Sequence, residues 1–205
     1  MKKGTLALII VGALFAVILL VVLIGAWFVI GKGNQMIRLD EGLKAAWGQV
    51  ENQYQRRYDL IPNLVEIVKG YAKHEKETLM GVTQARAKMG GMLNLPPEAL
   101  KNPAMMEKYR QAQQSLGGAL SRLMMLQERY PDLKANQNFR DLQAQLEGTE
   151  NRIAVERRRY NESVKTYNTY IRVFPNSIVA GMKGFTPAEL FKMDAGAKEA
   201  PKIKF

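Results

Sequence analysis

The chain has 205 residues, with 30 lysines and arginines against 19 aspartates and glutamates, one histidine and no cysteine. This length allows one domain and a tail, and the lack of cysteine excludes disulfides, thiolate nucleophiles and cysteine-based metal sites. The formal net charge of +11 suits contact with the anionic headgroups of a lipid membrane. We expect no nucleic acid as a partner, because none of the usual nucleic-acid-binding modules is present.

The first predicted element is a membrane anchor. Residues 6–30 form a run of 25 residues without a charge, about 37 Å long as a helix and therefore sufficient to cross a bilayer. Lysines lie on both sides, and Trp27 is near the far end, where interfacial aromatic residues are common. A cleaved signal peptide would have an apolar region of about 7–15 residues and a small-x-small cleavage site. We therefore predict a retained anchor over residues 1–32 that crosses the membrane once.

The orientation of the anchor is less strongly specified. Positive residues are almost balanced on the two sides of the apolar run, with Lys2 and Lys3 before it and Lys32, Arg38 and Lys44 after it. A short basic amino end followed directly by the span is typical of a signal anchor. We therefore expect the rest of the chain to lie outside the cytoplasm.

Residues 33–193 are predicted to form an all-α domain, an antiparallel bundle of long helices, since no run of alternating, β-branched residues indicates a strand. Apolar residues line one face of the first helix: Met36, Leu39, Leu43, Ala46, Val50, Tyr54 and Ile61. No proline separates the anchor from Pro62, so the anchor can run straight into this helix. At Pro62 two alternatives remain: Asp59 caps a new helix, or one continuous helix is kinked.

Two further helices are expected before the last long one. Their apolar positions are Leu64, Val68, Tyr71, Leu79 and Val82 for the first, and Tyr109, Leu116, Leu120, Leu123 and Tyr130 for the second. The breaker-rich stretch "GGMLNLPPEALKNP" predicts a loop between them. Pro131 should end the second helix.

The strongest helical pattern covers residues 138–174. Apolar residues recur there with heptad-like spacing: Phe139, Leu146, Ile153, Tyr160, Tyr167 and Phe174, with Leu142, Thr149, Val164 and Ile171 between them. Asn138 is expected to cap this helix and Pro175 to end it. The stretch "GFTPAELF" then predicts a short helix capped by Thr186, and residues 194–205 have the composition of a mobile tail.

The titratable residues do not form a recognisable catalytic pattern. "HEKET" at His74 resembles the start of a zinc-protease motif, but the chain has no second histidine, so we expect His74 to be exposed. The glutamates 150, 156 and 162 alternate with arginines at helical spacing, which favours surface ion pairs. Within that segment, Arg157, Arg158 and Arg159 are the candidate patch for an anion or a partner. We predict no catalytic residue, no cofactor and no metal site.

Three long blocks resemble a known family: "AWGQVENQYQRRYDLIPNLVEIVKGYAKHE", "YPDLKANQNFRDLQAQLEGTENRIAVERRRYN" and "YNTYIRVFPNSIVAGMKGF". Together they identify the chain as similar to the LemA family of bacterial membrane proteins, over roughly residues 34–191. The resemblance implies an amino-terminal anchor in the bacterial cell (inner) membrane and an antiparallel helical bundle. It supplies no catalytic residues, and some members are linked to the formation of membrane compartments.

Three functional hypotheses follow. The leading one is a non-enzymatic, membrane-anchored helical scaffold that self-associates and organises the bacterial envelope or recruits partners. The alternative is a monomeric adaptor or sensor that binds an envelope protein or an acidic ligand through the arginine-rich face. An enzyme is the least supported. For the scaffold we predict a cyclic homo-oligomer, the usual product when identical subunits meet head to tail and the rotation closes.

Overall fold

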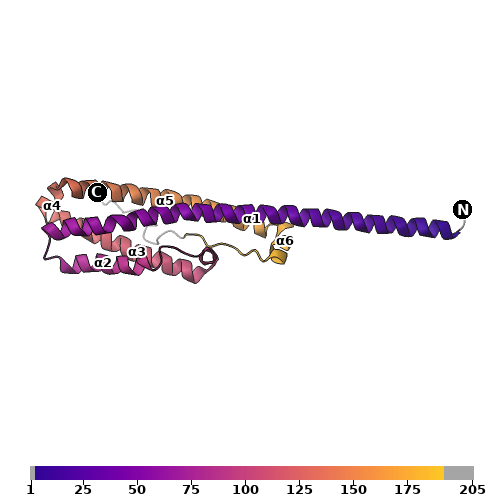
Figure 1. Ribbon diagram of the computed structural model, residues 1–205, viewed down its shortest axis with the longest axis horizontal. Coiled ribbons are helices and arrows are strands. Elements are labelled where there is room, and N and C mark those ends of the chain that lie inside the picture. Colours follow the sequence, from indigo (N-terminus) through magenta and orange to yellow (C-terminus); the bar gives the residue numbers. More distant parts are fainter. Residues whose placement is uncertain (1–2, 192–205) are drawn as a thin grey trace, which may run out of the picture.

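A computed structural model describes residues 3–191, all of them in helices, turns or irregular segments, with no strand in that range (Figure 1). The predicted all-α architecture is confirmed. The predicted tail at residues 194–205 lies outside the described residues. The helices are α1 (Lys3–Tyr71), α2 (Lys76–Gly90), η1 (Pro97–Lys101), α3 (Pro103–Met125), η2 (Leu126–Glu128), α4 (Pro131–Ala135), α5 (Gln137–Arg172) and α6 (Asn176–Lys183), where η1 and η2 are short 3₁₀ helices.

Helix α1 is continuous over 69 residues, about 104 Å at 1.5 Å per residue. By length and composition it is apolar enough to cross a membrane, with a mean hydropathy of 3.1 in its most apolar window. Its described side chains up to Trp27 are all exposed. Within the part of the chain that the structure describes, no other helix meets the same criteria.

Pro62 lies inside α1, so the single-helix alternative holds and Asp59 does not start a new helix. A proline inside a helix costs about 3 kcal/mol, because a backbone hydrogen bond is lost and the ring is crowded. The neighbouring Ile61 and Leu64 are almost fully buried, and burying such side chains offsets that cost. The buried face of α1 continues past the proline to Val68. Tyr71, at the end of the helix, was expected on this face but is 44% exposed.

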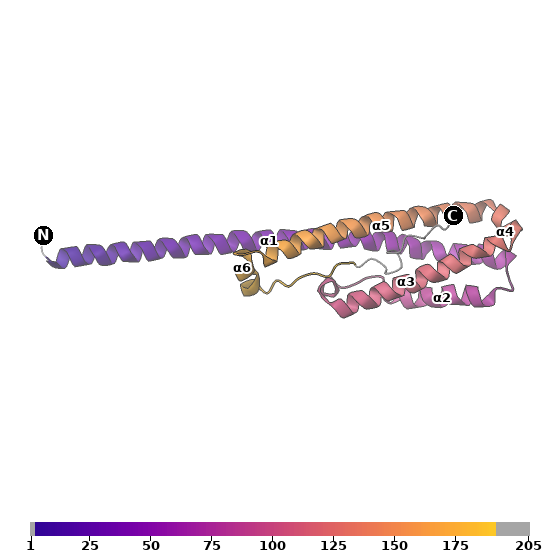
Figure 2. The same ribbon diagram turned by 180° about the vertical axis from the view of Figure 1, so that it is seen from behind.

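The bundle is built on α1 and α5, which run antiparallel side by side (Figures 1 and 2). Helix α5 has 36 residues, about 54 Å, so it returns from the far end of the bundle towards the apolar part of α1. Helices α2 and α3 pack against each other on the distal half, the half away from the apolar run, and α4 lies at the distal end. Helix α3 ends at Met125, earlier than the pattern predicted, because a 3₁₀ turn replaces its last turn.

The heptad-like face of α5 is buried as predicted, at Phe139, Leu146, Thr149, Ile153, Tyr160, Val164, Tyr167 and Ile171. Two details of the prediction are wrong. Phe174 is 77% exposed, because it follows the end of the helix. The cap is Asn136 and not Asn138: the backbone at Asn136 is extended, and its side chain accepts a hydrogen bond from the Phe139 amide at 2.9 Å.

The predicted short helix at "GFTPAELF" is also wrong. Helix α6 ends at Lys183, and its C-cap Gly184 has the left-handed φ of 72° that favours glycine. Residues 185–191 then form no helix and run as an extended segment (Figure 2). We call this segment the strap. It leaves α6 and runs back along the bundle beside α5 (Figure 2). Side chains of α5 bind its backbone groups, so it does not need the internal hydrogen bonds of a helix.

Candidate functional site

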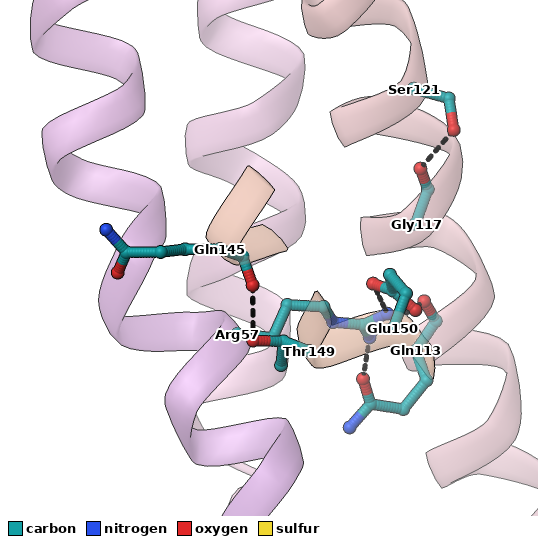
Figure 3. A network of polar contacts seen from close by, with 7 residues as sticks. All are labelled: Arg57, Gln113, Gly117, Ser121, Gln145, Thr149 and Glu150. Carbon is teal, nitrogen blue, oxygen red and sulfur yellow. Dashed lines mark hydrogen bonds and ion pairs between the residues drawn. The ribbon is translucent and has the colours of Figure 1, made fainter. Parts of the chain in front are cut away.

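A buried arginine links three helices in the middle of the bundle. Arg57 of α1 is only 4% exposed. Its Nη1 atom lies 2.8 Å from Oε1 of Glu150 on α5, and its Nη2 atom donates to the side-chain oxygen of Gln113 on α3 (Figure 3). Its Cζ atom also lies 5.1 Å from the centre of the Tyr54 ring. A buried charge is tolerated when it is paired and hydrogen-bonded, and the planar guanidinium can serve several partners at once.

Sequence reasoning missed Arg57, although a signal for it was present. Tyr54, Arg57 and Ile61 are spaced by three and four residues, so all three lie on the same face of α1. Tyr54 and Ile61, the apolar neighbours of Arg57 on that face, are both buried. A charged residue in an otherwise apolar helix face indicates a buried ion pair, and its acidic partner had to come from another helix.

Phe191, at the end of the strap, lies in an aromatic cluster beside Arg57. It is 4% exposed, its ring stacks on Trp47 at 6.2 Å between centroids, and Cζ of Arg157 lies 4.0 Å from its ring centre. Trp47 in turn contacts the rings of Tyr109 and Tyr160 edge-on. Burial raises the pKa of Tyr109 and of Tyr160 above the ordinary value of about 10, so both phenols stay protonated in alkaline solution as well as at neutral pH.

Two asparagines of α5 bind the backbone of the strap. Asn161 donates to the carbonyl of Phe191 at 2.9 Å and accepts from its amide at 2.7 Å. Asn168 makes the same pair of hydrogen bonds with Ala188, both at 2.8 Å. Each asparagine thus replaces the partner strand that an extended segment would have in a sheet.

The tyrosine before each asparagine completes this arrangement. The Tyr160 hydroxyl donates to the carbonyl of Glu189 and the Tyr167 hydroxyl to that of Thr186, both at 2.9 Å. The sequence therefore contains a Tyr-Asn pair twice, seven residues apart, at 160–161 and 167–168. This repeat was the available signal for a segment docked on α5.

Three arginines and one glutamate line a pocket of about 260 Å³ between the helices and the strap. The arginines are Arg57, Arg110 and Arg157, and the glutamate is Glu150. Arginines outnumber carboxylates in this lining, so its electrostatics favour an acidic group over a basic one. The size suits a carboxylate or another small anionic group. Arg57 is already paired with Glu150 and Arg110 with Glu107, so such a group would compete with these carboxylates for the guanidiniums.

The three arginines predicted as a patch have different environments. Arg157 lines the pocket and covers Phe191, Arg158 is exposed, and Arg159 pairs with Glu156 at 2.8 Å on the surface of α5. Consecutive residues of a helix point about 100° apart, so these three cannot form one surface. The Arg159 pair is the surface ion pair that the spacing indicated, whereas the glutamate at 150 pairs across helices.

The remaining candidate chemistry is limited. His74 is exposed in the turn after α1, as expected. Within residues 3–191, no three histidine, aspartate or glutamate side chains lie in an arrangement that could hold a metal ion.

An apolar amino-terminal helix that continues into a helical bundle defines a membrane-associated helical protein. The sequence profile of the LemA family matches residues 46–205, and the chain belongs to this family. The resemblance seen in the sequence is confirmed.

Individual relatives agree with this assignment. The chain is 28% identical over 174 residues to magnetosome protein MamQ 2 of Paramagnetospirillum magneticum, an alignment that covers 78% of this chain and 64% of the relative. The match to MamQ of Magnetospirillum gryphiswaldense is similar, at 28% over 173 residues, 77% of this chain and 64% of the relative. Protein LemA of Metamycoplasma hominis is 24% identical over 195 residues, 90% of this chain and 84% of the relative. The chain thus spans less than two thirds of the MamQ proteins.

Proposed function

We propose that the protein is a non-enzymatic, membrane-anchored scaffold that self-associates and organises the bacterial envelope or recruits partners. The observation that carries this proposal is the unbroken α1 helix, which contains both the apolar run and the central helix of the bundle. A helix of this kind has no flexible linker between membrane and domain. When spans associate, the bundles are therefore brought into a defined relative position.

Features of the span and of the bundle support self-association. Gly12 and Ala16 are spaced four residues apart, and small residues at this spacing let helices approach closely within a membrane. A methyl group at Gly12 would meet nothing within 4 Å, so this face is open in a single chain. Basic residues of one bundle would meet acidic residues of the next, an attraction that salt weakens.

The relatives support a role at a membrane. Two of them are named as magnetosome proteins, and we extend from that name only the proposal that this chain also organises a membrane-bounded structure. We place it in the bacterial cell membrane with a single span, and the bundle outside the cytoplasm. A cysteine introduced at an exposed bundle position tests the orientation directly, because the chain has no other thiol. Labelling of intact cells by an impermeant maleimide is expected, and labelling only after lysis would reverse the orientation.

Native mass spectrometry of the full-length protein in mild detergent, at two salt concentrations, tests the scaffold. We expect a discrete cyclic homo-oligomer at low salt that partly dissociates at high salt. A Gly12→Ile variant, which fills the close-approach position, should shift the distribution towards monomers. A strictly monomeric parent protein at both salt concentrations would contradict the scaffold.

A second function is favoured by the arginine-lined pocket. In this alternative the protein is a monomeric adaptor or sensor, and the pocket at Arg57, Arg110 and Arg157 binds an acidic group of an envelope protein or ligand. A monomer that binds an acidic peptide, with affinity lost in Arg110→Gln, would favour this alternative. Retained affinity in that variant would count against the pocket.

A further inference from the structure

Helix α6 lies at the level where the apolar run of α1 ends. A Cβ atom at Gly33 would lie 2.6 Å from Cε of Lys183, so the lysine stem at the end of α6 packs directly on the α1 backbone there. Lys32 lies over the Tyr170 ring of α5, with Nζ 5.9 Å from its centre, and Phe28 is half-buried against the bundle. The last apolar residue of the run is Ile30. The end of α5 and α6 therefore meet α1 at the predicted membrane boundary (Figure 1).

The outward face of this region is apolar. Val173 and Phe174, in the turn before α6, are 51% and 77% exposed, and Ile178 and Met182, one turn apart on α6, are 56% and 70% exposed. The inward face of α6, with Val179 and Ala180, is buried. Contiguous exposed apolar patches outside a span usually mark an interaction surface. This one lies beside the only segment of the described chain with the composition of a membrane span.

The charge of the same region is of one sign. The sequence has no acidic residue in positions 1–39 or in positions 163–188. The basic residues that these segments supply beyond the apolar run are Lys32, Arg38, Lys165, Arg172 and Lys183. Elsewhere in the bundle acidic and basic residues are mixed. An apolar face surrounded by positive charge, without acidic residues, is complementary to anionic lipid headgroups.

We propose that the turn at 173–175 and α6 form an interfacial lipid-binding element, whose exposed side chains enter the headgroup region of the same bilayer that α1 crosses. Arg172 and Lys183 contact anionic headgroups around it. The bundle is then attached to the membrane at two places, the span and α6, and two attachments restrict its tilt. This inference rests on the membrane anchoring proposed above and not on self-association. A second copy of the chain is the competing occupant of this face.

The test uses full-length, single-cysteine variants carrying an environment-sensitive fluorophore, in nanodiscs that contain anionic phospholipid. Ile178→Cys and Met182→Cys report on α6. Val155→Cys, at a position 41% exposed in the middle of α5, is the matched control outside the membrane, and Leu14→Cys reports on the span. Lipids that carry a nitroxide near the carbonyl region quench probes at the depth of about 5–10 Å that interfacial helices reach.

We expect blue-shifted emission and loss of fluorescence at both α6 positions, and neither at position 155. Blue-shifted emission without quenching by the nitroxide lipid would show that protein covers the face, and would overturn the inference. So would unquenched, unshifted emission at both α6 positions while Leu14→Cys is quenched by nitroxides deep in the bilayer. If the probe at position 14 is unquenched as well, the anchoring itself fails.

Discussion

The guanidinium of Arg57 on α1 lies 2.8 Å from the carboxylate of Glu150 on α5, although the residues are 93 positions apart in the chain. The two side chains differ greatly in exposure, 5% for the arginine and 45% for the glutamate. Water can therefore solvate the carboxylate, but it has little access to the guanidinium. The buried charge of Arg57 therefore depends on Glu150 for its neutralisation.

Removing the exposed partner should destabilise the bundle. Glu150→Ala leaves Arg57 buried without a counter-charge, and we expect a loss near or below the lower end of the about 3–5 kcal/mol found for broken buried pairs, since Gln113 still accepts. Adding Arg57→Met should restore much of this loss, because the uncompensated charge disappears. Unfolding followed by circular dichroism in nanodiscs measures both. Arg56→Ala, at the exposed neighbouring position, is the control and should change little.

The centre of the α5 seam should be sensitive to truncation. Ile153 is 3% exposed, which confirms the predicted burial, and Ile153→Ala should cost about 2–5 kcal/mol because it empties a packed site. Val155, two residues later, is 41% exposed, and Val155→Ala should stay within about 0.5 kcal/mol. Denaturant titration of both variants compares them. Equal losses of unfolding free energy in the two variants would mean that the buried seam of α5 contributes no more to packing than its exposed face.

The corrected cap of α5 makes a paired prediction. Asn136→Ala removes the acceptor for the Phe139 amide, and also the 2.9 Å hydrogen bond that the Asn136 amide donates to the Tyr71 hydroxyl. We expect a loss of about 1 kcal/mol. Asn138→Ala, two residues later and exposed, should change the free energy of unfolding by less than half as much. A larger loss of stability in Asn138→Ala than in Asn136→Ala would show that Asn138 is the cap.

The strap should open locally when an asparagine of α5 is removed. Asn168→Ala deletes both hydrogen bonds to the Ala188 backbone, which together contribute about 1–3 kcal/mol. This loss corresponds to amide exchange that is about 5- to 150-fold faster. Hydrogen–deuterium exchange of a peptide covering residues 185–191 measures it. The melting temperature should fall less than in Ile153→Ala, because Asn161 still binds the Phe191 backbone and the opening is local. Asn151→Ala, exposed on the same helix, should leave this exchange unchanged.

Asp40 should make the bundle sensitive to acid. Burial alone would raise its pKa, but hydrogen bonds and charge from Lys101 and Lys44 outweigh burial and hold the pKa below its ordinary value. A lowered folded-state pKa means that the stability it supplies is complete above the unfolded value of about 3.9 and is lost as the pH falls through the folded value.

Asp40→Asn should therefore be less stable than the parent at neutral pH, and the difference should shrink below about pH 4. Melting curves across this pH range measure the difference. Asp59→Asn, at an exposed position of the same helix, is the matched control. A difference between Asp40→Asn and the parent that is independent of pH would contradict the role of the charge.

The helices were predictable to different degrees for a physical reason. The seam of α5 follows from periodicity, because α5 packs along most of its length on one neighbour, α1. The strap was mispredicted because Thr186, Pro187 and Glu189 have the local signature of a helix start. Its extended form is stabilised by Asn161 and Asn168, whose positions relative to the strap depend on the turn through α6.

The candidate site shows the same division. Arg157 was found as one of three adjacent arginines, but its two neighbours along the chain face other directions. Its partners in the pocket, Arg57 and Arg110, come from α1 and α3. The spacing of residues within one segment says nothing about residues on other helices. Composition and local pattern could therefore indicate a basic helix face, but they could not show which side chains line the same pocket.

The sequence by itself determined the apolar run, the helical class and the buried face of α5. Each of these depends on residues within a few turns of one another, where helix geometry decides which side chains share a face. Only the tertiary structure decided the pairing of Arg57 with Glu150, the extended strap and the position of α6 at the end of the apolar run. A buried charge or an unpaired backbone group takes its partner from whichever segment packs against it, and here that segment is far away in the chain.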